Sequence, residues 1–331
     1  MRRVLAAVRR RAALLLLPLS LAPFVAVAPI VVESHAWLQR TQLGPLPAPA
    51  VSLSPAETAR FKPLPATPGR IPALVWHGIG DARDGYTVSR REFARQIALL
   101  DRLGYTAVSM EQWAAFRAGR ADGLPEKPIL LTFDDGRLDS YRGADAVLER
   151  YGMRAAMFVI TGEIERGSPF YTTWEELHAM EESGRWDVEP HAHAGHTTIR
   201  SSVGTAPFYA SRRPGESLAR WQWRVTEDVL AVRERFAEQG IRPTAFAVPY
   251  GDFGQRTAAH PAIPRIFAGV LRRRFGHFMV QAAGNDPRFT APGNGAAPRY
   301  ELGTTTTLAD LYRWLRRHTY EDSRKAPARA P

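Results

Sequence analysis

Hydrophobic and polar positions follow a repeating order from residue 71 to about residue 317. Short apolar runs of strand length are followed by stretches in which apolar residues recur every three or four positions, the spacing of an amphipathic helix. The pattern predicts strands at 71–77, 106–110, 127–133, 154–160, 186–191, 243–251 and 275–284. It predicts helices at 89–105, 111–119, 137–152, 173–184, 215–240 and 308–317. Ser89 is the predicted N-cap of the first of these helices, and Gly104 its predicted stop.

This alternation of strands and helices predicts an α/β fold with a parallel sheet, and the number of units favours a barrel. In such a barrel, catalytic groups gather where the strands end at their carboxyl ends. Four predicted strands end in residues that could take part in catalysis or metal binding. These are His77, the pair Asp134 and Asp135, His191, and the segment 249–251.

The region before residue 71 has a different character. Residues 1–11 are rich in arginine, and residues 12–32 carry no charge and would span about 30 Å as a helix. We expect 12–32 to be a transmembrane anchor or a cleaved signal peptide, with 1–11 as a cytoplasmic basic segment. Residues 33–70 are predicted to be a Pro-rich linker, 71–320 the folded domain and 321–331 a disordered tail. The domain is therefore expected outside the cytoplasm, on the cell membrane or secreted.

Charge and cysteine content restrict the chemistry. The net charge is +11, with arginine-rich clusters near both termini and at 272–274. No nucleic-acid-binding motif accompanies these clusters, so no nucleic-acid partner is predicted. The 331 residues include no cysteine. Disulfides, a thiol nucleophile and cysteine-ligated zinc are excluded, and any metal must be held by His, Asp or Glu.

Two adjacent carboxylates follow the predicted strand 127–133, in the sequence LTFDDG. One interpretation is that Asp134 or Asp135 caps the helix that follows. The other is a functional site, which His191, His193 and His196 favour because three of only nine histidines lie within six positions. Two imidazoles and one carboxylate suit Zn²⁺ or a similar ion, and the second carboxylate would remain free to move protons.

The ordered combination of TFDDG, a histidine pair about fifty-five residues later and a PYG strand end resembles the polysaccharide deacetylase family. This is the NodB homology domain, or carbohydrate esterase family 4, and the likeness extends from about residue 71 to residue 315. The segment LVWHGIG and the residues 86–110 are also similar to the extracellular poly-N-acetylglucosamine deacetylase-like branch. The resemblance implies a distorted (β/α)7-type barrel that removes N-acetyl groups from an amino-sugar polymer with a divalent metal.

The resemblance also implies residue roles. Asp134 matches the catalytic base, and Asp135, His191 and His196 match the metal ligands, with Zn²⁺ expected and Co²⁺ or Ni²⁺ as alternatives. His193 matches no ligand and is interpreted as a polar loop residue. The implied partners are an N-acetylated glycan and, through the N-terminal helix, the membrane, with no obligate protein partner.

The chain departs from the family pattern at two motifs. An arginine that usually orients the base is missing before PYG, where the chain reads AFAVPYG. Arg299 is a candidate replacement, and a surface position is the alternative. The late Leu-x-His motif is also missing, and His318 is expected at the surface. His77 then becomes the candidate general acid.

The segment PYG is expected to serve the substrate. Its residues Tyr250 and Gly251 are candidates for oxyanion or substrate contacts, through the backbone N–H of Tyr250. Trp76, Tyr250 and Phe253 could stack on sugar rings or could be packing residues.

Two other functions remain open at this level. The first is a membrane-tethered glycan-binding or assembly protein that has kept the fold and lost the chemistry. The second is a different metal hydrolase, such as a phosphoesterase, although these often use two metals and more ligands than the motifs supply. The identity of the glycan is not predicted.

Overall fold

The computed structural model describes residues 44–202, 204–258, 260–281 and 287–323. The predicted cytoplasmic segment 1–11, the predicted membrane segment 12–32 and the first part of the linker lie outside these residues. Within the described ranges, no helix combines the length and the apolar character needed to cross a bilayer.

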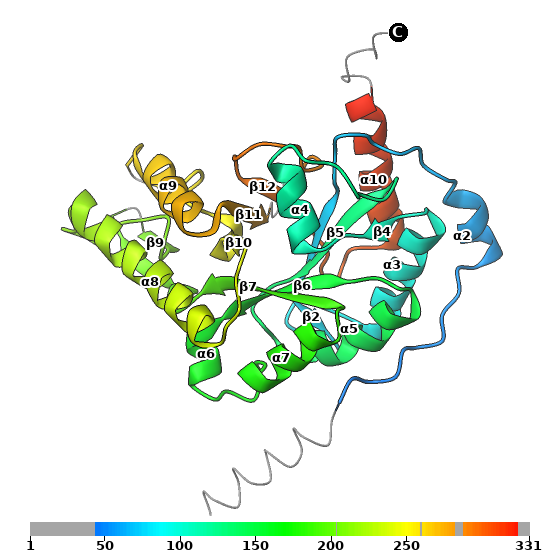
Figure 1. Ribbon diagram of the computed structural model, residues 1–331, viewed down its shortest axis with the longest axis horizontal. Helices are drawn as coiled ribbons and strands as arrows, with labels where there is room; N and C mark the ends of the chain where they lie inside the picture. Colours follow the sequence, from blue (N-terminus) through cyan, green and yellow to red (C-terminus); the bar gives the residue numbers. More distant parts are fainter. Residues whose placement is uncertain (1–43, 203, 259, 282–286, 324–331) are drawn as a thin grey trace, which may run out of the picture. The chain divides into compact units, whose positions relative to one another are not determined.

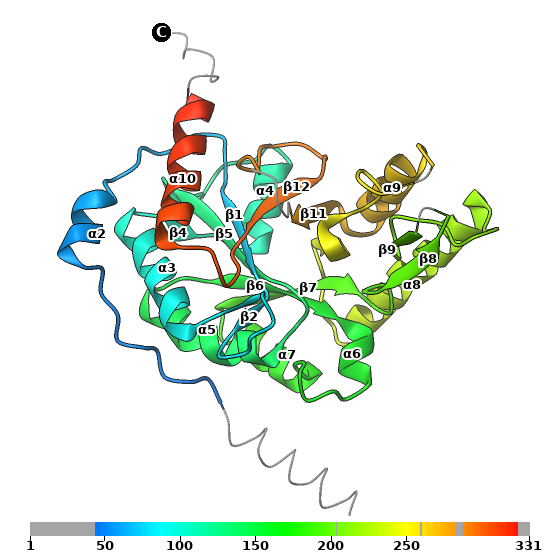
Figure 2. The same cartoon turned by 180° about the vertical axis from the view of Figure 1, so that it is seen from behind.

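The centre of the fold is an eight-stranded sheet whose strands pair in parallel. Its order is β10-β11-β12-β1-β5-β6-β7, with β4 paired to β5 beside this path (Figures 1 and 2). The strands are β1 (Ala73–Trp76), β4 (Thr106–Ala107), β5 (Pro128–Phe133), β6 (Ala155–Ile160), β7 (Trp186–Ala192), β10 (Ala245–Ala247), β11 (His277–Gln281) and β12 (Ala297–Glu301). The two end strands, β7 and β10, also lie side by side, so the sheet forms a nearly closed barrel. This confirms the predicted α/β class and the parallel arrangement.

Side chains bridge the gap between β7 and β10, where no strand pairing exists among the described residues. The buried carboxylate of Glu189 on β7 accepts hydrogen bonds from the backbone N–H groups of Thr244 (2.9 Å) and Ala245 (3.0 Å). Further along β7, the ring of His191 is bonded to the backbone oxygen of Ala247 at 2.8 Å. This junction between β7 and β10, the seam of the barrel, therefore includes His191, one of the predicted metal ligands.

Helices cover the outside of the strands (Figures 1 and 2). They are α2 (Pro55–Arg60), α3 (Arg90–Arg102), α4 (Met110–Arg117), α5 (Leu138–Arg150), α6 (Thr161–Glu165), α7 (Trp174–Glu182), α8 (Leu218–Glu238), α9 (Ile263–Phe275) and α10 (Leu308–Ser323). The short elements are β2 (Gly78–Ile79), β3 (Thr87–Val88), β8 (Thr198–Ser201), β9 (Gly204–Pro207) and the 3₁₀ turn Pro249–Gly251. The sequence pattern did not predict α9, β12 or the hairpin β8–β9.

Helix α3 shows how local sequence produces these elements. The side chain of Ser89 accepts a hydrogen bond from the backbone N–H of Glu92 at 3.2 Å, which caps the helix. Phe93, Ile97 and Leu100 are buried, and Gly104 follows the helix with a φ of 78°. The predicted cap and stop are both confirmed.

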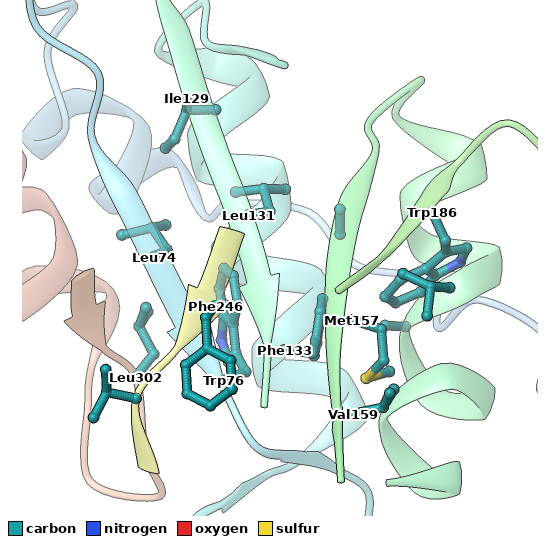
Figure 3. Packing of buried hydrophobic residues seen from close by; sticks show 14 of the residues in the cluster. Leu74, Trp76, Ile129, Leu131, Phe133, Met157, Val159, Trp186, Phe246 and Leu302 are labelled. Carbon is teal, nitrogen blue, oxygen red and sulfur yellow. The ribbon is translucent and has the colours of Figure 1, made fainter. Parts of the chain in front are cut away.

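The strand alternation separates two apolar faces. Ile129, Leu131 and Phe133 of β5 pack outward in the cluster that includes the buried residues of α3 and α5 (Figure 3). Leu130 belongs to a second cluster with inner residues of β6, β10, β11 and β12. Because side chains on a strand alternate, Asp134 lies on the inner face with Leu130.

Residues 45–70, within the predicted linker, include helix α2 and two side chains that reach the hydrophobic core. Phe61 and Leu64 are 2% and 5% exposed and belong to the outer cluster. The ring of Phe61 lies 5.1 Å from that of Tyr312 on α10. Helix α10 itself extends to Ser323, into the predicted tail.

Candidate active site

The two carboxylates of LTFDDG leave β5 in different environments. Asp134 continues the strand, with its N–H bonded to the backbone oxygen of Trp76 at 2.9 Å. Asp135 and Gly136 then take φ values of 74° and 73°, in the left-handed region. Aspartate tolerates this region better than most residues, and glycine adopts it freely. The N-cap of α5 is Arg137, which makes no side-chain cap, so the interpretation of these aspartates as helix caps is wrong.

Asp134 forms a fully buried ion pair with Arg299. The two guanidinium nitrogens of Arg299 donate to the two carboxylate oxygens of Asp134 at 2.6 and 2.7 Å. Arg299 also donates to the hydroxyl of Thr132 at 3.1 Å. Burial acts to raise the pKa of Asp134, but the charge and hydrogen bonds of Arg299, together with His191 and His77, outweigh it, and that pKa falls to about 2. Arg299 is therefore an interior residue, and the alternative of a surface position is wrong.

Asp135, His191 and His196 come together as a group that could hold a metal, with their ligand atoms within 4.8 Å of one another. Oδ1 of Asp135 lies 3.6 Å from Nε2 of His191 and 3.2 Å from Nε2 of His196. This Oδ1 is buried and has no hydrogen-bond partner among the described residues. The donor set and its unsatisfied oxygen fit a divalent cation.

His191 is prepared for such a cation by its surroundings. Burial lowers the pKa of His191 to about 4, so its ring is neutral at pH 7. The contact between Nδ1 and the backbone oxygen of Ala247 assigns the proton to Nδ1 and leaves the lone pair on Nε2. His193 lies outside the group, because its Nδ1 contacts the hydroxyl of Thr161 at 3.0 Å.

His77 lies directly after β1 and is 8% exposed. Its Nδ1 is 3.8 Å from Oε1 of Glu301 at the end of β12, and its ring is 5.3 Å from that of Tyr86. Glu301 was not singled out from the sequence. It stands two residues after Arg299, so strand alternation places both side chains on the same face of β12.

The PYG turn follows β10 and adjoins the histidines. Tyr250 has a φ of 59°, and its ring stacks on His196 at 5.0 Å with an interplanar angle of 27°. The N–H groups of Gly251 and Asp252 bond within the turn at 2.9 and 3.3 Å. The N–H of Tyr250 makes no such bond within the part of the chain that the structure describes. Of the two predicted residues of this turn, Tyr250 therefore lies beside His196, and Gly251 is a buried residue of the same turn.

The burial of Trp76 and His318 decides two other expectations from the sequence. Trp76 is fully buried, and its indole N–H donates to Gln96 at 2.9 Å, so it packs in the core and cannot stack on a sugar (Figure 3). His318 is 2% exposed and packs between Trp314 and Phe289, so its expected surface position is wrong. The apolar face of α10 explains its burial, since His318 is one turn beyond Trp314.

Comparison with known proteins identifies related sequences. Residues 121–261 match the family model described as polysaccharide deacetylase. The chain is 32% identical over 117 residues to YxkH of Bacillus subtilis (strain 168), which is named as a polysaccharide deacetylase, covering 35% of this chain and 40% of that protein. It is 25% identical over 206 residues to the poly-beta-1,6-N-acetyl-D-glucosamine N-deacetylase of Escherichia coli (strain K12), covering 54% and 30%. The chain thus matches less than half the length of these curated relatives.

Solved structures share the fold. A de-N-acetylase from Aggregatibacter actinomycetemcomitans superimposes with a TM-score of 0.65 over 74% of this chain and 99% of that chain. The sequence identity of this pair is 19%, so the match establishes the fold alone.

Proposed function

Since this chain carries a domain of the polysaccharide deacetylase family, we propose that it is a metal-dependent hydrolase that removes N-acetyl groups from an amino-sugar polymer. One observation carries the proposal. A carboxylate held by a buried arginine, Asp134, directly precedes Asp135, whose unsatisfied oxygen faces the Nε2 atoms of two histidines. A glycan-binding protein without catalysis would need no such separation of two adjacent carboxylates.

Asp135, His191 and His196 would hold the metal, with Zn²⁺ as the expected ion and Co²⁺ or Ni²⁺ as alternatives. When bound, a divalent ion of this kind lowers the pKa of water and polarises the acetamide carbonyl. The neutral ring of His191 and its bond to Ala247 fix one ligand before the ion arrives.

Asp134 is the proposed general base. Its low pKa keeps it ionised, and Arg299 fixes the plane of its carboxylate through two bonds. A carboxylate has about four acceptor positions, so the two bonds from Arg299 do not use all of them. Asp134 would take a proton from the water whose oxygen bonds to the acetyl carbon. The same Arg299 would replace the arginine that is missing before PYG.

His77 is the proposed general acid, and the turn at Tyr250 the proposed oxyanion contact. As imidazolium, His77 would be paired with Glu301 and would give its proton to the sugar nitrogen as the C–N bond breaks. The N–H of Tyr250, which makes no backbone hydrogen bond to the described residues, would donate to the developing oxyanion. The products are acetate and an amino sugar with a free amine.

The proposal extends to the substrate and to the location of the domain. The name of the Escherichia coli relative supports a β-1,6-linked N-acetylglucosamine polymer as the first substrate to test. The charge pattern of residues 1–32 supports a domain outside the cytoplasm, anchored to or released from the membrane. Protease added to intact cells should then degrade the domain, and complete protection would contradict this location.

The deciding experiment measures acetate release by the purified full chain from a panel of N-acetylated glycans. We expect release that a strong chelator abolishes and an added divalent metal restores. Asp134→Asn should keep the metal and lose activity by about 10²- to 10⁴-fold, the usual contribution of a general base. A metal-loaded wild type that binds a glycan but releases no acetate would favour the alternative of a glycan-binding protein.

A further inference from the structure

Neighbouring elements restrain the loop between the two predicted histidine ligands, His191 and His196. His191 belongs to β7 and His196 follows it after four residues, 192–195. The position of His196, which is partly exposed, therefore depends on the conformation of this loop rather than on strand pairing. The restraints come from α6, from α8 and from Tyr209.

Asp228 of α8 holds the middle of the loop. Its side chain accepts hydrogen bonds from two successive backbone N–H groups, those of His193 at 3.2 Å and Ala194 at 2.7 Å. The hydroxyl of Tyr209 donates to the same carboxylate. Asp228 is 8% exposed, and a buried carboxylate with three donors is a strong, directional anchor.

Tyr209 packs against Gly195, the last residue of the loop before His196. A Cβ atom at position 195 would overlap the tip of the Tyr209 ring, so only glycine fits there. The ring itself is fully buried and stacks on Phe267 at 4.8 Å. Tyr209 therefore cannot move away from Gly195 without disturbing its own packing against α9.

His193 completes the set of restraints from the side of α6. Its ring contacts the hydroxyl of Thr161 at 3.0 Å, and its backbone oxygen accepts the N–H of Gly162 at 3.2 Å. A histidine between two ligands thus serves to attach the loop, in agreement with its absence from the group that could hold a metal.

We propose that Asp228 is a positioning residue that presents His196 to the metal, with Tyr209 as its partner. The inference rests on the proposed metal-dependent function and goes beyond it, because neither residue touches the reacting atoms. Partners of this outer kind fix the orientation of ligands, and their loss commonly weakens metal affinity by about 10- to 100-fold. In Asp228→Asn the new amide group would face the N–H of His193, donor against donor, and the loop would lose this bond.

The test is the metal affinity of the full chain, measured by titrating metal-depleted protein with Zn²⁺. We expect Asp228→Asn to raise the Kd for Zn²⁺ by about 10- to 100-fold. The absorption spectrum of the Co²⁺ form, which reports ligand geometry, should change as well. The matched control is Asp145→Asn, because Asp145 is a similarly buried carboxylate, bonded to Trp186 and Arg185 away from the loop. The control should keep the wild-type Kd and spectrum.

A second variant covers the case in which Asp228→Asn does not fold. Tyr209→Phe removes one donor and leaves the ring against Gly195, so it should fold and weaken metal binding less than Asp228→Asn. An unchanged Kd and an unchanged Co²⁺ spectrum in the folded variants would overturn the inference alone. If the wild type binds no divalent metal, the proposed function fails first. An equal loss of affinity in Asp145→Asn would mean that general destabilisation, not positioning, is responsible, and would also overturn the inference.

Discussion

At the scale of residues, the ion pair between Asp134 and Arg299 fixes the orientation of the proposed general base. Both side chains are fully buried, and both oxygens of the carboxylate accept hydrogen bonds from Arg299. Removing one partner of such a pair commonly destabilises a protein by about 3–5 kcal/mol, because the other charge stays buried without compensation. A conservative change is therefore the better probe of function.

Arg299→Lys keeps the positive charge and loses the bidentate geometry, since an ammonium group cannot hold both oxygens in one plane. We expect kcat to fall about 100-fold from the misorientation of Asp134, with little change in metal content. Steady-state kinetics and metal analysis of the purified variant would measure both. A variant with wild-type kcat would show that Asp134 needs no such orientation.

His77 and Glu301 form the second pair at this scale. His77→Ala should lower kcat by about 10²- to 10⁴-fold and leave KM nearly unchanged, because the group is needed only when the amine departs. Glu301→Gln should lower kcat less, since the imidazole remains. The measurement is kcat and KM for acetate release from a soluble oligosaccharide. If kcat of His77→Ala equals that of the wild type, another residue supplies the proton.

The sequence predicted the site residues that lie in continuous motifs. His77, Asp134, Asp135 and His191 could be predicted to lie together because each follows or ends a strand, and His196 was singled out by its short distance from His191 in the sequence. Arg299 could be named from the sequence as a candidate partner of Asp134, but a surface position stayed open because the two residues are 165 positions apart in the chain. The strand that carries Arg299 is short and contains Pro298, so no periodic pattern indicated that the Arg299 side chain points inward.

At the scale of elements, the segments with a clear periodic pattern were predicted, whereas α9, β12 and the hairpin β8–β9 were not. The helices that became α3 and α8 begin at serine caps, and α3, α5 and α8 each have a continuous apolar face. Helix α9 contains Pro264 and Gly269, which weaken a helical pattern, and the hairpin β8–β9 is largely exposed. These elements are decided by tertiary packing, which propensity alone does not include.

The segment 45–70 gives a prediction at this scale. Phe61→Ala should reduce the free energy of unfolding by about 3–5 kcal/mol, the usual cost of removing a buried phenyl ring. The neighbouring exposed residue provides the control, since Lys62→Ala should change stability by less than about 0.5 kcal/mol. Urea denaturation of the two variants measures the difference. Equal stabilities would mean that this segment contributes no more than a linker.

At the scale of the whole molecule, the site assembles only when the sheet curves into a barrel. The strands that carry its parts, β1, β5, β7, β10 and β12, are spread over most of the domain. The parallel order brings β12 next to β1, and β1 next to β5, so that Glu301, His77 and Asp134 become neighbours. The seam between β7 and β10 then brings His191 and the PYG turn together. A sequence pattern can predict the class of the fold, but this closure depends on contacts between distant segments.

A ligand that joins the ends of β5 and β7 should stabilise the folded state as a whole. An ion that binds only the native protein adds about 2.7 kcal/mol when its concentration is 100 times its Kd. For a domain of this size each kcal/mol shifts Tm by about 2–4 °C, so we expect Zn²⁺ to raise the Tm of metal-depleted protein by about 5–10 °C. Differential scanning calorimetry of the full chain would measure the shift. Asp135→Asn is the control, because asparagine also tolerates the left-handed backbone there while the carboxylate ligand is lost. Its Tm should respond little to Zn²⁺, and a shift as large as that of the wild type would mean that the ion binds elsewhere.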